Sequence, residues 1–131
     1  MKILQLDDSN SKRMEVQSVL KRMGIRGSVW VQSVEEGVTA LQQAIAEGTP
    51  FDAAITDMHY PVRAGGPAEL KAGRILIQTL KEQQIDVPVI VFSTSRLQEE
   101  DAFATIWYDA RANWEYDLET ILKKIRSNKP C

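Results

Sequence analysis

Cysteine and histidine are nearly absent from this chain of 131 residues, which has one of each. The cysteine is the terminal Cys131, so we expect no internal disulfide and no cysteine-rich metal site. No apolar run approaches the roughly 18–20 residues that cross a bilayer, and the start turns acidic at Asp7, too early for a secretory signal peptide. The net charge of −2 indicates no general attraction to nucleic acid or to an anionic membrane. We therefore expect one cytoplasmic domain over residues 1–131, in which residues 127–131 form a frayed tail.

Short apolar runs alternate along the chain with segments in which apolar residues recur at helical spacing. This alternation predicts a parallel sheet with helices on both faces. We expect a flavodoxin-like (βα)5 α/β domain, a doubly wound five-stranded parallel sheet with the strand order 2-1-3-4-5. The expected strands are Ile3 to Leu6, Val29 to Val31, Phe51 to Asp57, Val87 to Phe92 and a weaker one at Ala112 to Trp114. The first expected helix begins at an N-cap among Ser9 to Ser11 and ends at Gly24. The others run from the capping box of Ser33 and Glu36 to Gly48, around Leu76 to Leu80, from Ser95 through Trp107, and from near Asp117 to Arg126.

Acidic and hydroxyl side chains stand where several predicted strands end. They are Asp7 and Asp8 after the first strand, Asp57 at the third, Ser93 and Thr94 at the fourth, and Glu115 at the fifth. Because the carboxyl ends of parallel strands meet at one edge of the sheet, we expect these side chains to lie together. Carboxylates in one place repel each other unless a cation is present, and a few hard oxygen ligands suit Mg²⁺. A strand-end carboxylate there can attack phosphorus and form an aspartyl phosphate.

These features make the chain resemble a response-regulator receiver domain, the phosphoacceptor module of two-component signalling, over roughly residues 2–125. The resemblance rests on the pair Asp7-Asp8, on the pattern Asp57-x-x-x-Pro61 and on the run Pro88-Val-Ile-Val-Phe-Ser93. It implies that Asp57 is the phosphoacceptor and that a Mg²⁺ ion is bound by Asp7, Asp8, Asp57 and the backbone carbonyl of Met58. It also implies that Ser93 is the switch hydroxyl, with Thr94 in its place if the register differs by one.

Three departures from the family pattern affect the expected mechanism. The family has a Lys, usually followed by Pro, at the end of the fifth strand, and the matching pair here is Glu115-Tyr116. A carboxylate there would repel a phosphoryl group that an ammonium would bind. The family also has an aromatic switch residue two or three positions before that Lys. The matching position here falls near Ala112 or Asn113, and neither residue is aromatic. The loop at 62–73 is longer than the family's usual one, ends at Gly73, and is expected to be irregular around its Gly-Gly-Pro.

The long loop carries three cations, Arg63, Lys71 and Arg74. They are either solvated loop charges or the source of a positive charge that folds over Asp57 and replaces the absent lysine. The second hypothesis is attractive because the lost lysine and the cationic insertion occur in the same chain.

Several residues also have a plainer interpretation. Asp7 or Asp8 can cap the first helix instead of binding metal, and Ser93 can be a strand-end hydroxyl without a switching role. His59, two residues after Asp57, is more simply an exposed imidazole than a proton carrier. The aromatic residues Trp107, Tyr108, Trp114 and Tyr116 are expected mostly in the core, although an exposed Trp there would anchor an interface.

The resemblance implies a stand-alone receiver, not an enzyme, that accepts a phosphoryl group from a histidine kinase or phosphotransfer protein. It would signal by contact with a downstream protein, without direct binding to nucleic acid or membrane, and a homodimer stays open. The alternative is a phosphorylation-independent pseudo-receiver that serves as a protein-interaction module. A haloacid-dehalogenase-type phosphatase is disfavoured because its second Asp would stand where His59 is, and no glycine-rich loop follows the first strand to bind a nucleotide.

Overall fold

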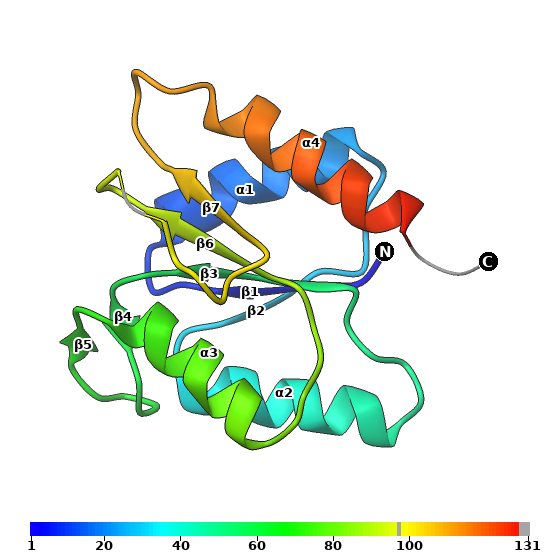
Figure 1. Ribbon diagram of the computed structural model, residues 1–131, viewed down its shortest axis with the longest axis vertical. Coiled ribbons are helices and arrows are strands. Elements are labelled where there is room, and N and C mark those ends of the chain that lie inside the picture. Colours follow the sequence, from blue (N-terminus) through cyan, green and yellow to red (C-terminus); the bar gives the residue numbers. More distant parts are fainter. Residues whose placement is uncertain (97, 129–131) are drawn as a thin grey trace.

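A computed structural model describes residues 1–96 and 98–128 of the chain. Its main sheet has five parallel strands in the order β2-β1-β3-β6-β7 (Figure 1). The strands are β1 (Ile3–Leu6), β2 (Val29–Val31), β3 (Ala53–Asp57), β6 (Val89–Ser93) and β7 (Ala104–Trp107). Numbered along the chain, this order is 2-1-3-4-5, so the predicted flavodoxin-like sheet is confirmed.

Two helices cover each face of the sheet (Figure 1). They are α1 (Asn10–Arg22), α2 (Val34–Ala46), α3 (Ala72–Glu82) and α4 (Trp114–Ser127). Alternating strand residues divide the core, with one set packed against α1 and α4 and the other against α2 and α3. In β1, for example, Ile3 belongs to the first set, whereas Leu4 belongs to the second. The strands are therefore buried on both faces, as their continuous apolar runs indicate.

The ends of the first two helices form as the sequence predicts. The side chain of Ser9 accepts a hydrogen bond from the amide of Lys12, and Gly24 has a φ of 75° just past the end of α1. At α2, Ser33 Oγ accepts from the amide of Glu36, as the predicted capping box requires, and the Glu36 carboxylate accepts from the Ser33 hydroxyl.

The segment after β3 is more ordered than the irregular loop that we expected. It contains a two-stranded antiparallel ribbon of β4 (Tyr60–Pro61) and β5 (Ala68–Glu69). Tyr60 is fully buried, and the carbonyl of Val62 accepts from the amide of Glu35 at the start of α2. Helix α3 then begins at Ala72, so the glycine taken as the end of the loop lies inside the helix.

The segment after β6 differs most from the prediction. The helix expected from Ser95 through Trp107 is wrong, because Ala104–Trp107 pair with β6 as the fifth strand and the described residues between the two strands form no helix. The spacing of Phe103, Ile106 and Trp107 fits a helix, but the run from Thr105 to Tyr108 is β-branched and aromatic, which also suits a strand. Pairing with β6 decides between the two, since it satisfies a row of backbone groups.

The end of the chain changes accordingly. The strand expected at Ala112 to Trp114 is wrong, because Asn113 caps α4 and Trp114 is its first residue. Helix α4 continues to Ser127, one residue into the expected frayed tail, and residues 129–131 lie outside the described residues. Among residues 1–96 and 98–128, no helix has the length and apolar character needed to cross a membrane.

Candidate functional site

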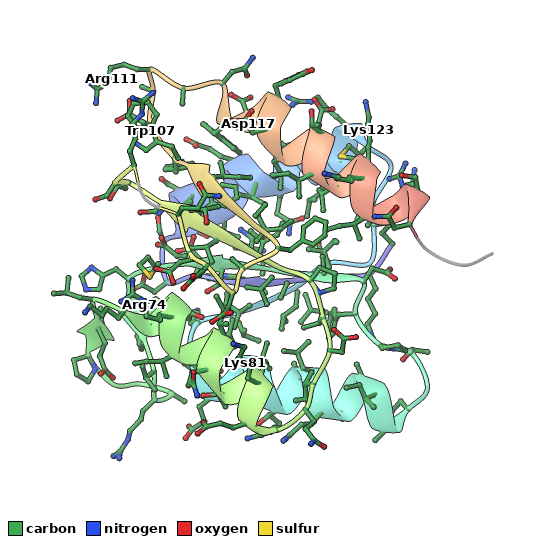
Figure 2. The ribbon with its side chains drawn as sticks, viewed as in Figure 1. Arg74, Lys81, Trp107, Arg111, Asp117 and Lys123 are labelled. Carbon is green, nitrogen blue, oxygen red and sulfur yellow. The ribbon has the colours of Figure 1, made fainter. Side chains whose placement is uncertain are left out.

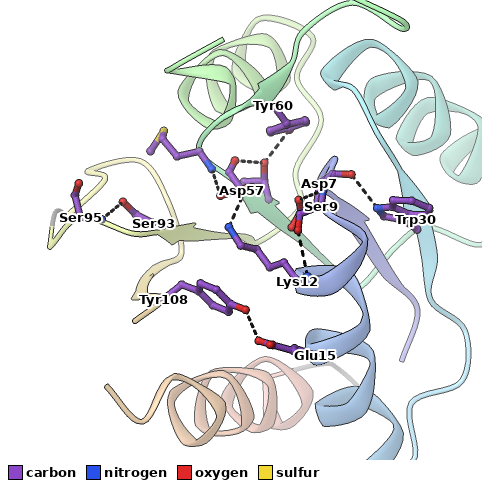
Figure 3. A network of polar contacts seen from close by, with 12 residues as sticks. Asp7, Ser9, Lys12, Glu15, Trp30, Asp57, Tyr60, Ser93, Ser95 and Tyr108 are labelled. Carbon is purple, nitrogen blue, oxygen red and sulfur yellow. Dashed lines mark hydrogen bonds and ion pairs between the residues drawn. The ribbon is translucent and has the colours of Figure 1, made fainter. Parts of the chain in front are cut away.

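Three aspartates meet at the carboxyl end of the sheet, and Figure 3 shows two of them, Asp7 and Asp57. Asp57 is the last residue of β3, and Asp7 and Asp8 directly follow β1, which pairs with β3. Each of the three offers a carboxylate oxygen, and these atoms lie within 4.8 Å of one another. The predicted convergence is therefore confirmed for these three aspartates, and their hard oxygen donors fit a small divalent cation.

Asp7 is the most buried of the three, with 3% of its surface exposed. Burial raises the pKa of its carboxyl to about 6, with smaller contributions from the charges of Asp57 and Asp8, while the Ser9 amide that donates to it acts in the opposite direction. The indole Nε1 of Trp30 donates to the Asp7 carbonyl at 2.9 Å, which holds this turn against β2. A cation would relieve the unfavourable charge on Asp7.

The two carboxylate oxygens of Asp57 have different donors. Oδ1 accepts from the amide of Met58 at 2.9 Å, and Oδ2 lies 3.0 Å from Nζ of Lys12 in the first turn of α1 (Figure 3). Both side chains of this ion pair are largely buried, with 13% of Lys12 and 10% of Asp57 exposed. Asp57 thus has one neutral and one charged partner.

Sequence reasoning missed Lys12. One signal was available, because a cation in the first turn of a helix is disfavoured by the helix dipole and needs another partner. The first turn of α1 contains no acidic residue to compensate it. The start of α1 also follows the carboxyl end of β1, so a long side chain there can reach the neighbouring strand end.

Ser93 and Thr94 both line a cleft of about 420 Å³ that includes Asp57. Ser93, the last residue of β6, is buried, and its Oγ accepts from the amide of Ser95 at 3.1 Å. Thr94 is exposed. Of the two hydroxyl residues, Ser93 is therefore the one whose position beside Asp57 is fixed by a strand, as the sequence predicts.

The loop after Asp57 contributes a carbonyl and an imidazole to the surroundings. The carbonyl of Met58 accepts from the amide of Gly73 at 3.1 Å, which leaves its second lone pair for another partner. His59 is exposed at the cleft, in agreement with the simple loop interpretation.

Glu115 does not occupy the position that the sequence assigned to it. It is an exposed residue in the first turn of α4, 3.9 Å from Arg22, because the fifth strand lies at 104–107 instead of 112–114. Because the fifth strand ends at Trp107 and Tyr108 follows it, the aromatic position expected near Ala112 or Asn113 is also wrong. Glu115 therefore gives no reason to expect a repulsive carboxylate beside Asp57.

Tyr108 joins the site to the core of the α1 and α4 face. Its ring lies 4.8 Å from the Lys12 ammonium and packs with Phe92 and Trp114, and its hydroxyl donates to Glu15 (Figure 3). Trp114 is buried, as expected of a core aromatic. Trp107 and Tyr116 behave differently. Trp107 is partly exposed, and the guanidinium groups of Arg96 and Arg111 both lie over its ring (Figure 2 shows Arg111 beside it). Tyr116 is 62% exposed.

The three loop cations, Arg63, Lys71 and Arg74, occupy different places relative to the cleft that contains Asp57. Arg74 lines the cleft, but its guanidinium is paired with Glu99 at 2.6 Å (Figure 2 labels Arg74). Lys71 is exposed at the rim of the same cleft, and Arg63 lies next to the start of α2 in a different depression. Within the described residues, none of these three cations contacts the Asp57 carboxylate. The cation that contacts it is Lys12.

Comparison with known proteins gives fold neighbours only. A scan against protein-family models finds no match, and neither does a comparison with curated proteins. Among solved structures, the receiver domain of a sensor histidine kinase from Pseudomonas aeruginosa, with a magnesium ion coordinated in its active-site cleft, is 19% identical, with a TM-score of 0.68 over 97% of this chain and 98% of that one. A CheY-like receiver domain from Methylobacillus flagellatus is 15% identical, with a TM-score of 0.67 over 95% and 98% of the two chains.

A two-component response regulator from Cytophaga hutchinsonii is 16% identical, with a TM-score of 0.72 over 97% of both chains. These likenesses extend over nearly the whole chain. The protein therefore has the fold of response-regulator receiver domains, as the sequence resemblance predicts.

Proposed function

We propose that this protein is a receiver module that accepts a phosphoryl group on Asp57 from a histidine kinase or phosphotransfer protein and signals by contact with a downstream protein. One observation carries the proposal: Asp57 ends a central strand within 4.8 Å of the Asp7 and Asp8 carboxylates and opens into a cleft that Ser93 also lines. The receiver fold makes a phosphoacceptor role for Asp57 more plausible, but the proposal rests on the arrangement of the site residues.

The reaction is a transfer between two nucleophiles. A carboxylate oxygen of Asp57 attacks the phosphorus of a phosphohistidine, a new P–O bond forms, and the P–N bond breaks with its electron pair retained by the imidazole. Asp7, Asp8, Asp57 and the carbonyl of Met58 would hold a Mg²⁺ ion, which would neutralise the carboxylates and supply a Lewis acid for the transfer. Ser93 then offers a hydroxyl from the neighbouring strand to another phosphoryl oxygen. We expect no turnover of a separate substrate.

Intact mass after incubation with acetyl phosphate and Mg²⁺ tests the proposal. A gain of one phosphoryl group in the wild type that is absent in Asp57→Asn would support it. The Asp57→Asn side chain keeps the size of Asp57 and removes the nucleophile. No gain in the wild type, also with a histidine kinase as donor, would overturn it.

The second candidate is a phosphorylation-independent interaction module. It is favoured by the Lys12–Asp57 ion pair, which already neutralises the carboxylate and leaves only 10% of that side chain exposed. Under this alternative, partner binding would be the same for the wild type and Asp57→Asn, before and after treatment with the phosphodonor. Dependence of partner binding on phosphorylation would exclude it.

A further inference from the structure

The positive charge beside Asp57 comes from an element other than the fifth strand. We propose that Lys12 of α1 is the residue that binds the phosphoryl group on Asp57. The inference rests on the proposed function, and it assigns the cation of that site to the first turn of α1.

The position of Lys12 is defined by contacts on two sides. Its ammonium lies 3.0 Å from Oδ2 of Asp57 and 4.8 Å from the centre of the Tyr108 ring. The hydroxyl of Tyr108 donates to Glu15, one turn further along α1, so the ring is fixed against the same helix (Figure 3). Lys12 therefore extends between an aromatic face and the carboxylate, where water is largely excluded and a charge interaction is strong.

Other cations near the cleft are already engaged or stand further out. Arg74 makes a bidentate pair with Glu99, and Lys71 is exposed at the rim. At the end of β7, the chain continues with Tyr108 and Asp109 instead of a lysine. Arg111, the next cation, is paired with Asp109 at 2.9 Å. Within the described residues, Lys12 is the cation in contact with Asp57.

Phosphorylation would move negative charge outward from Asp57 and would also add to it. When the carboxylate forms the acyl phosphate, its own oxygen atoms lose their charge, and the phosphoryl oxygens a few ångströms further out carry a larger one. A lysine has a flexible stem and rotatable donors, so its ammonium can follow the charge from Oδ2 to the phosphoryl group. The same residue would thus neutralise Asp57 before transfer and bind the phosphoryl group afterwards.

Two titrations of Lys12→Gln test this role because only one of the two affinities is expected to fall. The first uses Mg²⁺ alone, which should bind as tightly as to the wild type or more tightly, since the carboxylate loses a competing cation. The second uses beryllofluoride, a phosphoryl stand-in, at saturating Mg²⁺. Its affinity should fall roughly ten- to one-hundredfold with the loss of one charge-assisted hydrogen bond.

The chain offers matched controls. Lys21→Gln removes the same charge from an exposed position near the other end of α1 and should change neither titration. Lys12→Met keeps an unbranched apolar side chain of similar length and should repeat the loss if Lys12→Gln folds poorly. The triple variant Arg63→Ala, Lys71→Ala, Arg74→Ala should retain beryllofluoride affinity within about twofold, as expected for exposed charges.

The outcomes separate the two proposals. If the wild type binds beryllofluoride and both Lys12 variants bind it equally well, the Lys12 assignment is overturned while the phosphoacceptor function stands. A loss confined to the triple variant would also overturn it and assign the cation to the loop. If the wild type neither binds beryllofluoride nor gains a phosphoryl group, the proposed function fails and the Lys12 assignment fails with it.

Discussion

The amide of Gly73 in the first turn of α3 donates to the carbonyl of Met58 at 3.1 Å, directly after the proposed phosphoacceptor. The two backbones approach so closely that a Cβ on Gly73 would meet the Asp57 carbonyl at 2.7 Å and Cα of Met58 at 3.2 Å. The long segment between them, with its small β4–β5 ribbon, therefore returns the chain to the acidic site. This contact fixes the direction of a carbonyl that is a candidate metal ligand.

Gly73→Ala should damage both stability and metal binding. The added methyl group meets backbone atoms, which cannot rotate away, so we expect a loss of about 1–2 kcal/mol in the free energy of unfolding despite the better helix propensity of Ala. Mg²⁺ affinity should fall as well, because the Met58 carbonyl is displaced. Chemical denaturation and calorimetric titration measure the two effects. Gly27→Ala is the control, since its Cβ would make only an ordinary contact of 3.4 Å.

Asp7→Asn should stabilise the protein at neutral pH. Burial raises the pKa of Asp7 from its ordinary value of 3.8 to about 6, so the folded protein binds more protons than the unfolded chain between these values. Stability therefore decreases as the pH rises from about 4 to 6, and the decrease is complete above pH 6. Removal of this charge should raise the free energy of unfolding at pH 7 by roughly 3 kcal/mol and flatten its pH dependence.

Mg²⁺ provides the second half of this test. The ion should stabilise the wild type by neutralising Asp7, and it should stabilise Asp7→Asn much less. Denaturation midpoints with and without Mg²⁺, at pH 4, 6 and 8, give the comparison. A pH profile of Asp7→Asn that matches the wild type would contradict the assignment of the raised pKa. Asp8→Asn, at an exposed carboxylate, is the control and should shift the profile less.

Ser93→Ala should weaken phosphoryl binding without much change in stability. Among the described residues, its Oγ has one hydrogen-bond partner, the amide of Ser95, so we expect a cost below about 1 kcal/mol. Beryllofluoride affinity at saturating Mg²⁺ should fall about tenfold, because a hydroxyl donor to the phosphoryl oxygens is lost. Thr94→Ala should leave the affinity unchanged. The reverse result would assign the hydroxyl role to Thr94.

The sequence could predict those parts of the fold and site that depend on short-range patterns. Caps such as Ser33 with Glu36 act within one turn, and the apolar run before Asp57 needs both faces covered wherever it lies. Once the strands are parallel, their carboxyl ends meet, so the proximity of Asp7, Asp8 and Asp57 follows from strand order alone. These features were predictable because each is determined by neighbours in the chain or by the topology of the sheet.

Only the tertiary structure decided the segment from Phe103 to Trp114 and the partner of Asp57. Thr105, Ile106 and Trp107 suit a strand as well as a helix, and the pairing of Ile106 with Phe92 on β6 settled the assignment, which removed Glu115 from the site. Lys12 reaches Asp57 across 45 positions of sequence because α1 starts beside the end of β3. No local pattern encodes that distance, since it depends on how a helix packs on the sheet and on the aromatic ring that supports the lysine.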